Sequence, residues 1–386
     1  MVRNGSGIVI CSGGWRLPMT WANIALLRSA GVTLPVEVWH VAGEMTWAGQ
    51  ELLRMLGATP RLLTSIGRRD GYFHAPFAVA QTTFDEVLVL DSDMTIFVGI
   101  EHLFSGKGYI QTGILLAPDI LDLRSREFYP EAWERLGLPA PACPTAARCP
   151  AVWGTDSALM VLNLRRCPGA AAMLRALTAD AAESQRYAWA GDKELYQLAW
   201  QAAGCLPAFL PFPSLLGQAS EQVGFVGLAL GHRGPDGSLL GVHWAWSKPT
   251  LHHSVPGLPL AEAPPPSGYA DPTEHHLNHA DEVSAGILAA SGEVREHFYL
   301  LRFGSCFSQD GQKAPCTRRS IDIAKPLRRF SARLSFARWA LHDCGPEEVP
   351  AARCPLRRRL PDGARKQAAA AFADSLARSW TLAQRR

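Results

Sequence analysis

The chain has 386 residues, of which 47% are hydrophobic and 19% are charged, and its formal net charge at pH 7 is +3. This composition is typical of a globular protein with a sizeable core and excludes an intrinsically disordered chain. The net charge is too small to argue for a nucleic-acid-binding protein. We expect no membrane span, because no apolar run reaches 18 residues, and no signal peptide, because the first residues lack its charged-then-apolar layout.

Strands and helices alternate over the first 90 residues. Apolar runs typical of buried strands lie at residues 7–11, 36–40 and 87–90. Helical spacing of apolar residues predicts helices at residues 19–30, 46–56 and 76–83. This order predicts an α/β fold with a three-layer, mostly parallel sheet. The first strand is not followed by GxGxxG, so a dinucleotide-binding cradle is not predicted.

The pattern continues to about residue 245. We expect strands at residues 96–98, 113–116, 157–164, 225–230 and 241–244, and helices opened by Pro168 and by Asp192. Residues 249–269 are rich in Pro, Gly and His and read as a linker, and residues 270–386 carry scattered helical patterns without a recognisable motif. We therefore predict one catalytic domain over residues 5–250 and a linker with a C-terminal extension over 251–386.

The nine cysteines fall into two groups. One group lies in apolar contexts and is predicted to be buried thiols: Cys11, Cys167 and Cys205. The other forms pairs that are close in sequence and lie in loop-like stretches: Cys143 with Cys149, Cys306 with Cys316, and Cys344 with Cys354. These pairs suit short-loop disulfides of a secretory lumen, and six reduced cysteines of a cytosolic protein are the alternative.

Two carboxylates one residue apart follow the strand at residues 87–90. Ligands of open α/β sheets bind beyond the carboxyl ends of strands, where Asp91 and Asp93 are expected to lie. Carboxylates held so close repel each other unless a cation neutralises them, so the pair predicts Mn²⁺ or Mg²⁺. The alternative is a solvated, Asp-rich turn.

A second polar segment follows about 150 residues later. His243 stands at the predicted end of a strand, where its imidazole can complete a metal site begun by two carboxylates. Lys248, five residues on, offers a point charge suited to phosphate. Together with the acid pair, these residues predict a site for a metal-bridged diphosphate. A core histidine and a solvated loop cation are the alternatives.

The order of these segments resembles the fungal-type Golgi α-mannosyltransferase family (α-1,2- and α-1,3-mannosyltransferases), within the nucleotide-sugar glycosyltransferases of GT-A fold. The matching pieces are Gly7-Ile8-Val9-Ile10-Cys11, Ile24-Ala25-Leu26-Leu27-Arg28, Leu34-Pro35-Val36-Glu37-Val38-Trp39-His40, Leu88-Val89-Leu90-Asp91-Ser92-Asp93, Gly191-Asp192-Lys193-Glu194 and Gly241-Val242-His243. The segment from His243 to Lys248 also resembles the end of the catalytic domain in retaining glycosyltransferases related to glycogenin.

The resemblance implies roles for the metal and the diphosphate. Asp91 would approach the ribose or the metal, and Asp93 would bind Mn²⁺ directly. His243 would be the third protein ligand, and Lys248 would contact the donor diphosphate. The reaction implied is transfer of a hexose, mannose from GDP-mannose, to a glycan or glycoprotein acceptor with retention of anomeric configuration.

Other roles carried over from the family concern the sugar and the nucleotide. Asp192 would orient donor or acceptor hydroxyls, with a helix N-terminal acid as the alternative. Asp156 or Asn163 would stabilise an oxocarbenium-like transition state, and Arg28 would lie near the nucleotide. Ordinary strand-end residues and a surface arginine are the alternatives. The family also implies the Golgi lumen, with the membrane involved only through an anchor that this chain does not carry.

Other functions remain open. A UDP-sugar donor would keep the same mechanism, as in glycogenin-like enzymes. Residues 91–95 also fit the DxDxT nucleophile motif of haloacid-dehalogenase-type phosphatases, but Tyr196 stands where the downstream metal motif needs an acid. A third alternative is a degenerate domain that only binds a sugar or a partner. The basic run at residues 357–359 and the histidines of residues 252–279 are interpreted as solvated surface features.

Overall fold

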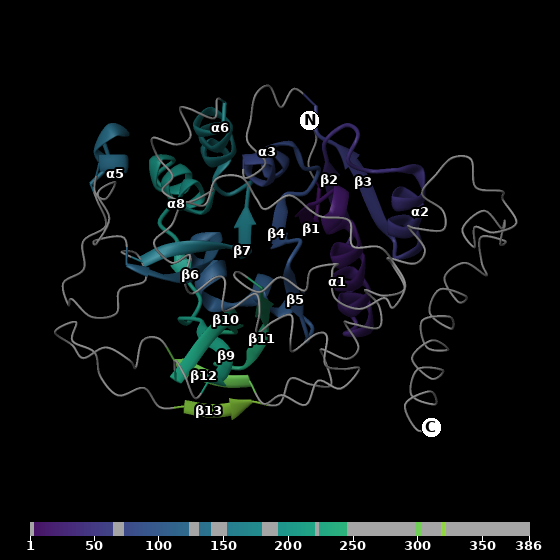
Figure 1. Ribbon diagram of the computed structural model, residues 1–386. Helices are drawn as coiled ribbons and strands as arrows, with labels where there is room; N and C mark the ends of the chain where they lie inside the picture. The colour runs from purple at the N-terminus through teal and green to yellow at the C-terminus, as the bar shows by residue number, and fades with distance from the viewer. Residues whose placement is uncertain are drawn as a thin grey trace, which may run out of the picture.

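The computed structural model describes residues 4–64, 73–122, 131–139, 153–179, 192–220, 224–244, 298–302 and 318–321. Within these residues two β-sheets meet, with helices packed around the first of them (Figure 1). None of the helices in these ranges combines the length and the apolar character that crossing a membrane requires.

The first sheet has seven strands in the order β3-β2-β1-β4-β7-β6-β8. Their bounds are β1 Ser6–Cys11, β2 Val36–His40, β3 Ala58–Leu62, β4 Glu86–Asp91, β6 Ile114–Asp122, β7 Trp153–Asn163 and β8 Ala208–Phe209. Strand β7 runs antiparallel to both of its neighbours, and the other described pairings are parallel. The predicted α/β class with a mostly parallel sheet is confirmed.

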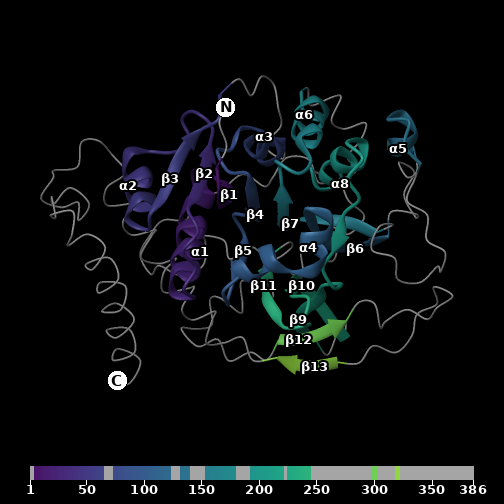
Figure 2. The ribbon, with the colours of Figure 1, turned by 180° about the vertical axis from the view of Figure 1, so that it is seen from behind.

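Alternating side chains of the sheet face two separate hydrophobic cores, because successive residues of a strand point to opposite faces. Along β4, Val87 and Val89 belong to one core, which they share with α3, α6 and α8. Leu88 and Leu90 belong to the other core, together with residues of α1 and α2. Helices therefore cover both faces of the sheet, as the three-layer prediction requires (Figure 2).

Helices α1, α2, α3, α6 and α8 lie close to predicted positions, whereas α4 and α5 were not predicted. Their bounds are α1 Leu17–Ser29, α2 Trp47–Met55, α3 His74–Gln81, α4 Lys107–Thr112, α5 Glu131–Arg135, α6 Pro168–Leu177 and α8 Lys193–Ala202, with short 3-10 helices at Gly14–Arg16 and Glu101–Ser105. Thr46 caps α2 by accepting a hydrogen bond from the Gly49 backbone N–H at 3.2 Å. Pro168 opens α6, as predicted from its fixed φ angle.

The second sheet is antiparallel and has the order β13-β12-β9-β10-β11-β5. Its strands are β5 Met94–Ile96, β9 Ser214–Ser220, β10 Gly224–Arg233, β11 Leu239–His243, β12 Phe298–Arg302 and β13 Arg318–Ile321. Strands β12 and β13 come from the region expected to carry helical patterns, so that expectation is wrong for these two segments. The backbone pairing of β12 with β9 joins them to the rest of the sheet.

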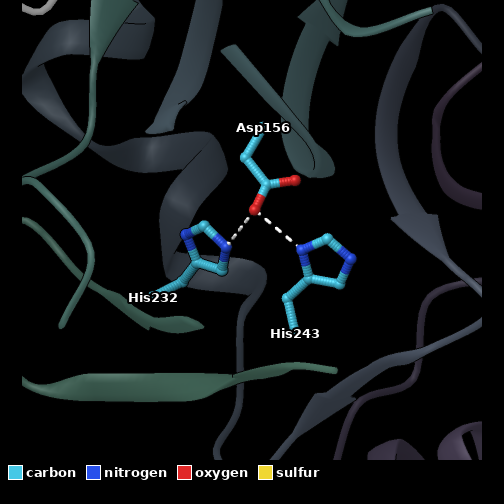
Figure 3. Close-up of side chains that lie close together, drawn as sticks. All are labelled: Asp156, His232 and His243. Carbon is cyan, nitrogen blue, oxygen red and sulfur yellow. Dashed lines mark hydrogen bonds and ion pairs between the residues drawn. The ribbon is translucent and has the colours of Figure 1, made fainter. Parts of the chain in front are cut away.

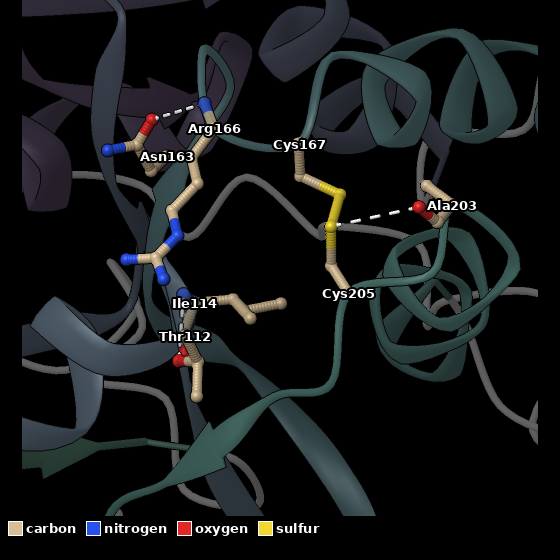
Figure 4. The surroundings of a disulfide bond; sticks show 7 residues. All are labelled: Thr112, Ile114, Asn163, Arg166, Cys167, Ala203 and Cys205. Carbon is tan, nitrogen blue, oxygen red and sulfur yellow. Dashed lines mark hydrogen bonds between the residues drawn. A yellow bond between two sulfur atoms is a disulfide. The ribbon is translucent and has the colours of Figure 1, made fainter.

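Cys167 and Cys205 form a disulfide, so the prediction that both are thiols is wrong (Figure 4). Cys167 precedes α6 and Cys205 follows α8, and these two helices pack against each other. Packing brings the two Cα atoms within 6.5 Å of each other although 38 residues separate them in sequence. Cys11 is a free thiol, as predicted, and burial raises its pKa. The six paired loop cysteines lie outside the described residues.

Candidate active site

The acid pair lies where the chain passes from one sheet to the other. Asp91 is the last residue of β4 in the first sheet, and Asp93 directly precedes β5 of the second sheet. Asp93 is buried and Asp91 is partly exposed. The predicted placement of both carboxylates beyond the carboxyl end of a buried strand therefore holds in the structure.

Side chains from two other elements hold this turn in place. Asn23 of α1 donates a hydrogen bond from Nδ2 to the backbone oxygen of Ser92 at 2.8 Å. Its Oδ1 accepts a hydrogen bond from Thr95 Oγ1 at 2.9 Å, and Thr95 Oγ1 in turn accepts one from Trp244 Nε1 at 2.9 Å. All three side chains are buried. The chain is thus fixed on either side of Asp93, which limits how far its carboxylate can shift.

Strand β11 brings a histidine to the acid pair. It pairs antiparallel with β5, and His243 stands opposite Met94, next to Asp93. The two strands approach closely at Gly241, where a Cβ atom would lie 2.3 Å from the backbone oxygen of Thr95. Glycine is therefore required at this point of the pairing. His243 Nε2 ends up 3.7 Å from Asp93 Oδ1.

The structure brings together the three residues predicted to bind metal. Ligand atoms of Asp91, Asp93 and His243 all lie within 4.8 Å of one another. Around an octahedral cation with metal–ligand distances of about 2.1 Å, neighbouring ligand atoms stand about 3 Å apart and opposite ones about 4 Å. Two carboxylates and one imidazole are also a donor set that Mn²⁺ accepts. The residues therefore fit a divalent cation, and their binding of one remains a prediction.

Asp156 connects His243 to a second histidine (Figure 3). Its Oδ2 lies 2.8 Å from His243 Nδ1 and 2.8 Å from His232 Nε2. Its Oδ1 accepts a hydrogen bond from the Ala158 backbone N–H at 3.0 Å. Both oxygens of this buried carboxylate are thus occupied by hydrogen-bond partners within the protein.

The carboxylate of Asp156 and the ring of His243 shift each other's pKa values. Burial disfavours the ionised form of Asp156, but His243 and His232 outweigh it and hold its pKa well below the usual range. Burial likewise disfavours a charged His243, and the carboxylate of Asp156, with smaller contributions from Asp93 and Asp91, raises its pKa to about 9.

Asp192 lies on the acid side of the same site. It directly precedes α8, and its Oδ1 accepts a hydrogen bond from Ser157 Oγ at 3.2 Å. Burial raises its pKa well above the usual value, and the charge of Asp91 adds to this effect. Asp192 and Asp156 are therefore brought to the predicted site, although their roles there remain predictions.

Two other predicted residues, Arg28 and Asn163, are not brought to this place. Arg28 lies near the end of α1, where its guanidinium donates hydrogen bonds to the backbone oxygens of residues 32, 34 and 56 at 2.8 to 3.0 Å. Asn163 pairs with Glu86 at the opposite end of β4, about 17 Å of strand from Asp91. Asn163 lies far from Asp91 because β7 runs antiparallel to β4. Lys248 lies outside the described residues.

Two groups near the site were not predicted. His232 lies on β10, whose register places it diagonally across from His243 on the same face of the sheet. Extending the predicted strand at residues 225–230 to the turn at 234 would have revealed this pairing. The second group is a buried ion pair of Lys193 with Asp119, with Glu194 Oε1 3.5 Å from the same ammonium. We find no signal in the sequence for this second group.

Fold and site together define an α/β protein with a candidate divalent-cation centre at the carboxyl edge of its sheet. Residues 5–141 match the model of a protein family described as "Mannosyltransferase putative". The matched region includes Asp91 and Asp93 and ends before Asp156, His232 and His243.

Curated relatives agree with this match. The α-1,2-mannosyltransferase MNN2 of Saccharomyces cerevisiae is 29% identical over 125 residues, which are 30% of this chain and 21% of that protein. MNN2 of Candida albicans is 27% identical over 148 residues, which are 36% of this chain and 24% of that protein. The matches thus span less than a quarter of these relatives' length. Over this part of the chain the predicted resemblance to the fungal mannosyltransferase family is confirmed.

Solved structures of glycosyltransferases are also similar to this chain. The core-mannan synthase A of Aspergillus fumigatus, in an Mn/GDP form, matches 51% of this chain and 70% of its own, with a TM-score of 0.38 and 9% identity. The glycosyltransferase GlyE of Streptococcus pneumoniae matches 54% of this chain and 45% of its own, with a TM-score of 0.36 and 14% identity.

Proposed function

We propose that the chain is a glycosyltransferase that depends on a divalent metal and moves a hexose, mannose from GDP-mannose, to a glycan or glycoprotein acceptor with retention. The observation that carries this proposal is the meeting of Asp91, Asp93 and His243 within 4.8 Å, at the edge of an α/β sheet whose first strands match a mannosyltransferase family. Neither half of this observation would suffice, because the fold and the acid pair are each found with many chemistries.

In this function Asp91, Asp93 and His243 hold Mn²⁺ or Mg²⁺. The cation, when bound, supplies Lewis-acid stabilisation for the negative charge that develops on the departing nucleoside diphosphate. The turn that carries Asp91 and Asp93 contributes to metal binding because it is rigid. The hydrogen bonds that Asn23 donates to the Ser92 backbone and accepts from Thr95 fix the chain around Asp93, so that this ligand does not have to be ordered when the donor binds.

Asp192 is the candidate for contact with the sugar. It is held by Ser157, and its raised pKa means that it keeps its proton to a higher pH than an ordinary aspartate. A protonated carboxyl can donate a hydrogen bond to a sugar hydroxyl as well as accept one. Lys248 is the proposed contact of the donor diphosphate, on the basis of the sequence alone.

The disulfide supports a setting in the secretory pathway. Disulfides persist in oxidising compartments and are rare in the cytosol. The Cys167–Cys205 bond therefore favours an oxidising lumen, and the resemblance to the Golgi mannosyltransferase family leads us to propose the Golgi.

A donor panel tests the proposal. The purified chain is incubated with GDP-mannose and a set of UDP-sugars, with and without Mn²⁺, and release of the nucleoside diphosphate is measured. We expect release of GDP from GDP-mannose that needs both Mn²⁺ and Asp93, with Asp93→Asn inactive. Glu86→Gln, at the other end of the same strand, is the matched control and should remain active.

Each other result has a defined meaning. Release from UDP-sugars alone would keep the metal mechanism and reject mannose. Consumption of no nucleotide sugar, or release that Asp93→Asn does not change, would reject the proposed function. The anomeric configuration of the product, read by NMR with an added mannoside acceptor, tests retention separately.

A further inference from the structure

Two imidazoles share one carboxylate oxygen next to the candidate cation centre. His232 Nε2 and His243 Nδ1 each lie 2.8 Å from Asp156 Oδ2, and the ring centroids are 6.3 Å apart (Figure 3). An ionised carboxylate can only accept hydrogen bonds, so both of these nitrogens carry a proton. Each histidine is thereby restricted in its tautomer and in the orientation of its ring.

The His232 ring is held by its hydrogen bond to Asp156. Its side chain is fully buried, and its Nδ1 has no hydrogen-bond partner. Because Nε2 must carry the proton that Asp156 accepts, a neutral His232 leaves this unpartnered Nδ1 without a proton. The hydrogen bond of the ring therefore supports Asp156: Nε2–H donates to Oδ2, while the Ala158 N–H donates to Oδ1.

The consequence falls on His243. With Nδ1–H directed to Asp156, a neutral His243 presents its free lone pair on Nε2, and Nε2 is the nitrogen that lies 3.7 Å from Asp93 Oδ1. A histidine that binds a metal commonly donates its other ring N–H to a carboxylate, which fixes the tautomer and raises the basicity of the ligand. The geometry around Asp156 has this form.

We propose that Asp156 and His232 are positioning residues, which together fix the ring and tautomer of His243 so that Nε2 faces the cation held by Asp91 and Asp93. This inference rests on the proposed metal-dependent function. It gives Asp156 a different role from the one that the family resemblance implies, because both of its oxygens are already occupied by protein donors.

A second metal held by Asp156, His232 and His243 is the alternative, since their ligand atoms are also close together. Ligand atoms around a tetrahedral zinc stand about 3.3 Å apart, as follows from zinc–ligand bonds of about 2.0–2.1 Å. The two N···O distances of 2.8 Å are instead hydrogen-bond lengths. The observed spacing therefore favours hydrogen bonds over a shared cation.

The test measures binding of Mn²⁺ to the full chain by calorimetry, which needs neither donor nor acceptor. The variants are Asp156→Asn, His232→Leu and His232→Gln, with Asp93→Asn as the control for loss of a direct ligand. Loss of such outer partners typically costs about 10- to 100-fold in metal affinity, and we expect this for Asp156→Asn and His232→Leu. His232→Gln, whose amide N–H can replace Nε2–H, should restore most of the affinity.

A second readout distinguishes positioning from a purely structural role. The ¹⁵N signals of the histidine rings are recorded for the metal-free chain, above the pKa of His243. The unchanged chain should show the Nδ1–H tautomer at His243, and Asp156→Asn should shift the signal toward the Nε2–H tautomer. Should His232→Leu fail to fold, as seen in its thermal melt, the folded Asp156→Asn and His232→Gln variants carry the test.

The contrary outcomes are distinct. If Asp93→Asn abolishes Mn²⁺ binding while Asp156→Asn and His232→Leu leave it unchanged, the positioning role is wrong and the proposed function stands. If the unchanged chain binds no Mn²⁺, both are wrong. If Zn²⁺ binds with loss in His232→Leu but not in Asp93→Asn, a second metal site replaces the positioning role.

Discussion

The two ends of strand β4 both carry acids, and they are supplied with partners in opposite ways. At the start of the strand, Glu86 accepts hydrogen bonds from Ser6 Oγ at 2.7 Å, Tyr109 OH at 2.8 Å and Asn163 Nδ2 at 3.2 Å. Three neutral donors from three different elements surround one carboxylate. This acid holds secondary-structure elements together.

At the other end of β4, the acids lie close to other ionisable side chains. Asp91 and Asp93 lie close to His243, and the charge of Asp91 adds to burial in raising the pKa of Asp192. An acid kept beside other acids costs free energy unless something neutralises it. The comparison teaches that neighbours, not burial alone, distinguish an acid among neutral donors, such as Glu86, from acids placed beside other ionisable groups.

The largest expected effect is on activity. Asp93→Asn removes a direct ligand, and a bound metal contributes several kcal/mol of charge stabilisation, so we expect a loss of about 1,000-fold in kcat/KM. The stability of the metal-free fold should change little, because the variant loses both the repulsion from Asp91 and the attraction to His243, whose Nε2 lies 3.7 Å from Asp93. Steady-state kinetics and urea unfolding measure the two quantities. A large loss of stability would mean that Asp93 belongs with Glu86 as a structural acid.

The next effect concerns the edge of the sheet away from the acid pair. Opening the Cys167–Cys205 bond with the double variant Cys167→Ser and Cys205→Ser should lower the free energy of unfolding by about 3–4 kcal/mol, as for a loop of this length. Activity of the folded protein should be retained. Unfolding with and without reductant measures it, and Cys11→Ser serves as the control for loss of a thiol. Equal stability in both conditions would contradict this prediction.

A smaller loss is expected at the start of β4. Glu86→Ala leaves the donors of Tyr109 and Asn163 without their acceptor, and we expect a cost of about 2 kcal/mol in the free energy of unfolding. The donor KM should not change. Circular dichroism during urea unfolding gives the first quantity and kinetics the second. An activity loss as large as that of Asp93→Asn would overturn the distinction between the two ends of the strand.

The smallest effect tests whether Arg28 serves the donor or the fold. Its guanidinium donates to three backbone oxygens, so Arg28→Gln should cost about 1 kcal/mol of stability and leave the KM for the donor unchanged. Arg54→Gln, which breaks an exposed ion pair with Glu51 and an exposed hydrogen bond to Gln50, should cost less than about 0.5 kcal/mol. If the donor KM rises for Arg28→Gln but not for Arg54→Gln, Arg28 contributes to donor binding and this prediction is wrong.

The sequence predicted much of the alternation of strands and helices, because most of the predicted strands are short, mainly apolar runs. It did not predict β3, β8 or β9. It also predicted the meeting of Asp91, Asp93 and His243, since each stands at the end or start of a recognisable strand. The antiparallel pairing of β11 with β5, which brings His243 there, was not predicted.

Where direction or long-range packing decides, the sequence was not enough. Asn163 was expected at the site, but β7 runs antiparallel and carries it to the other edge. Cys167 and Cys205 have only apolar neighbours in sequence, and their pairing arises from the packing of α6 on α8. His232 lies past the apolar part of its strand, so only the register of the β10–β11 hairpin places it beside Asp156.

The close approach of β11 to β5 at Gly241 has a consequence for the order in which the protein is made. The acid pair leaves the ribosome 150 residues before His243 (243 minus 93). At about 5–20 residues per second, roughly 8 to 30 seconds of synthesis separate the two carboxylates from their imidazole. During that interval β4 can already pair with β1, because both strands have been made. The three residues of the candidate cation centre are therefore complete only after β11 has been made.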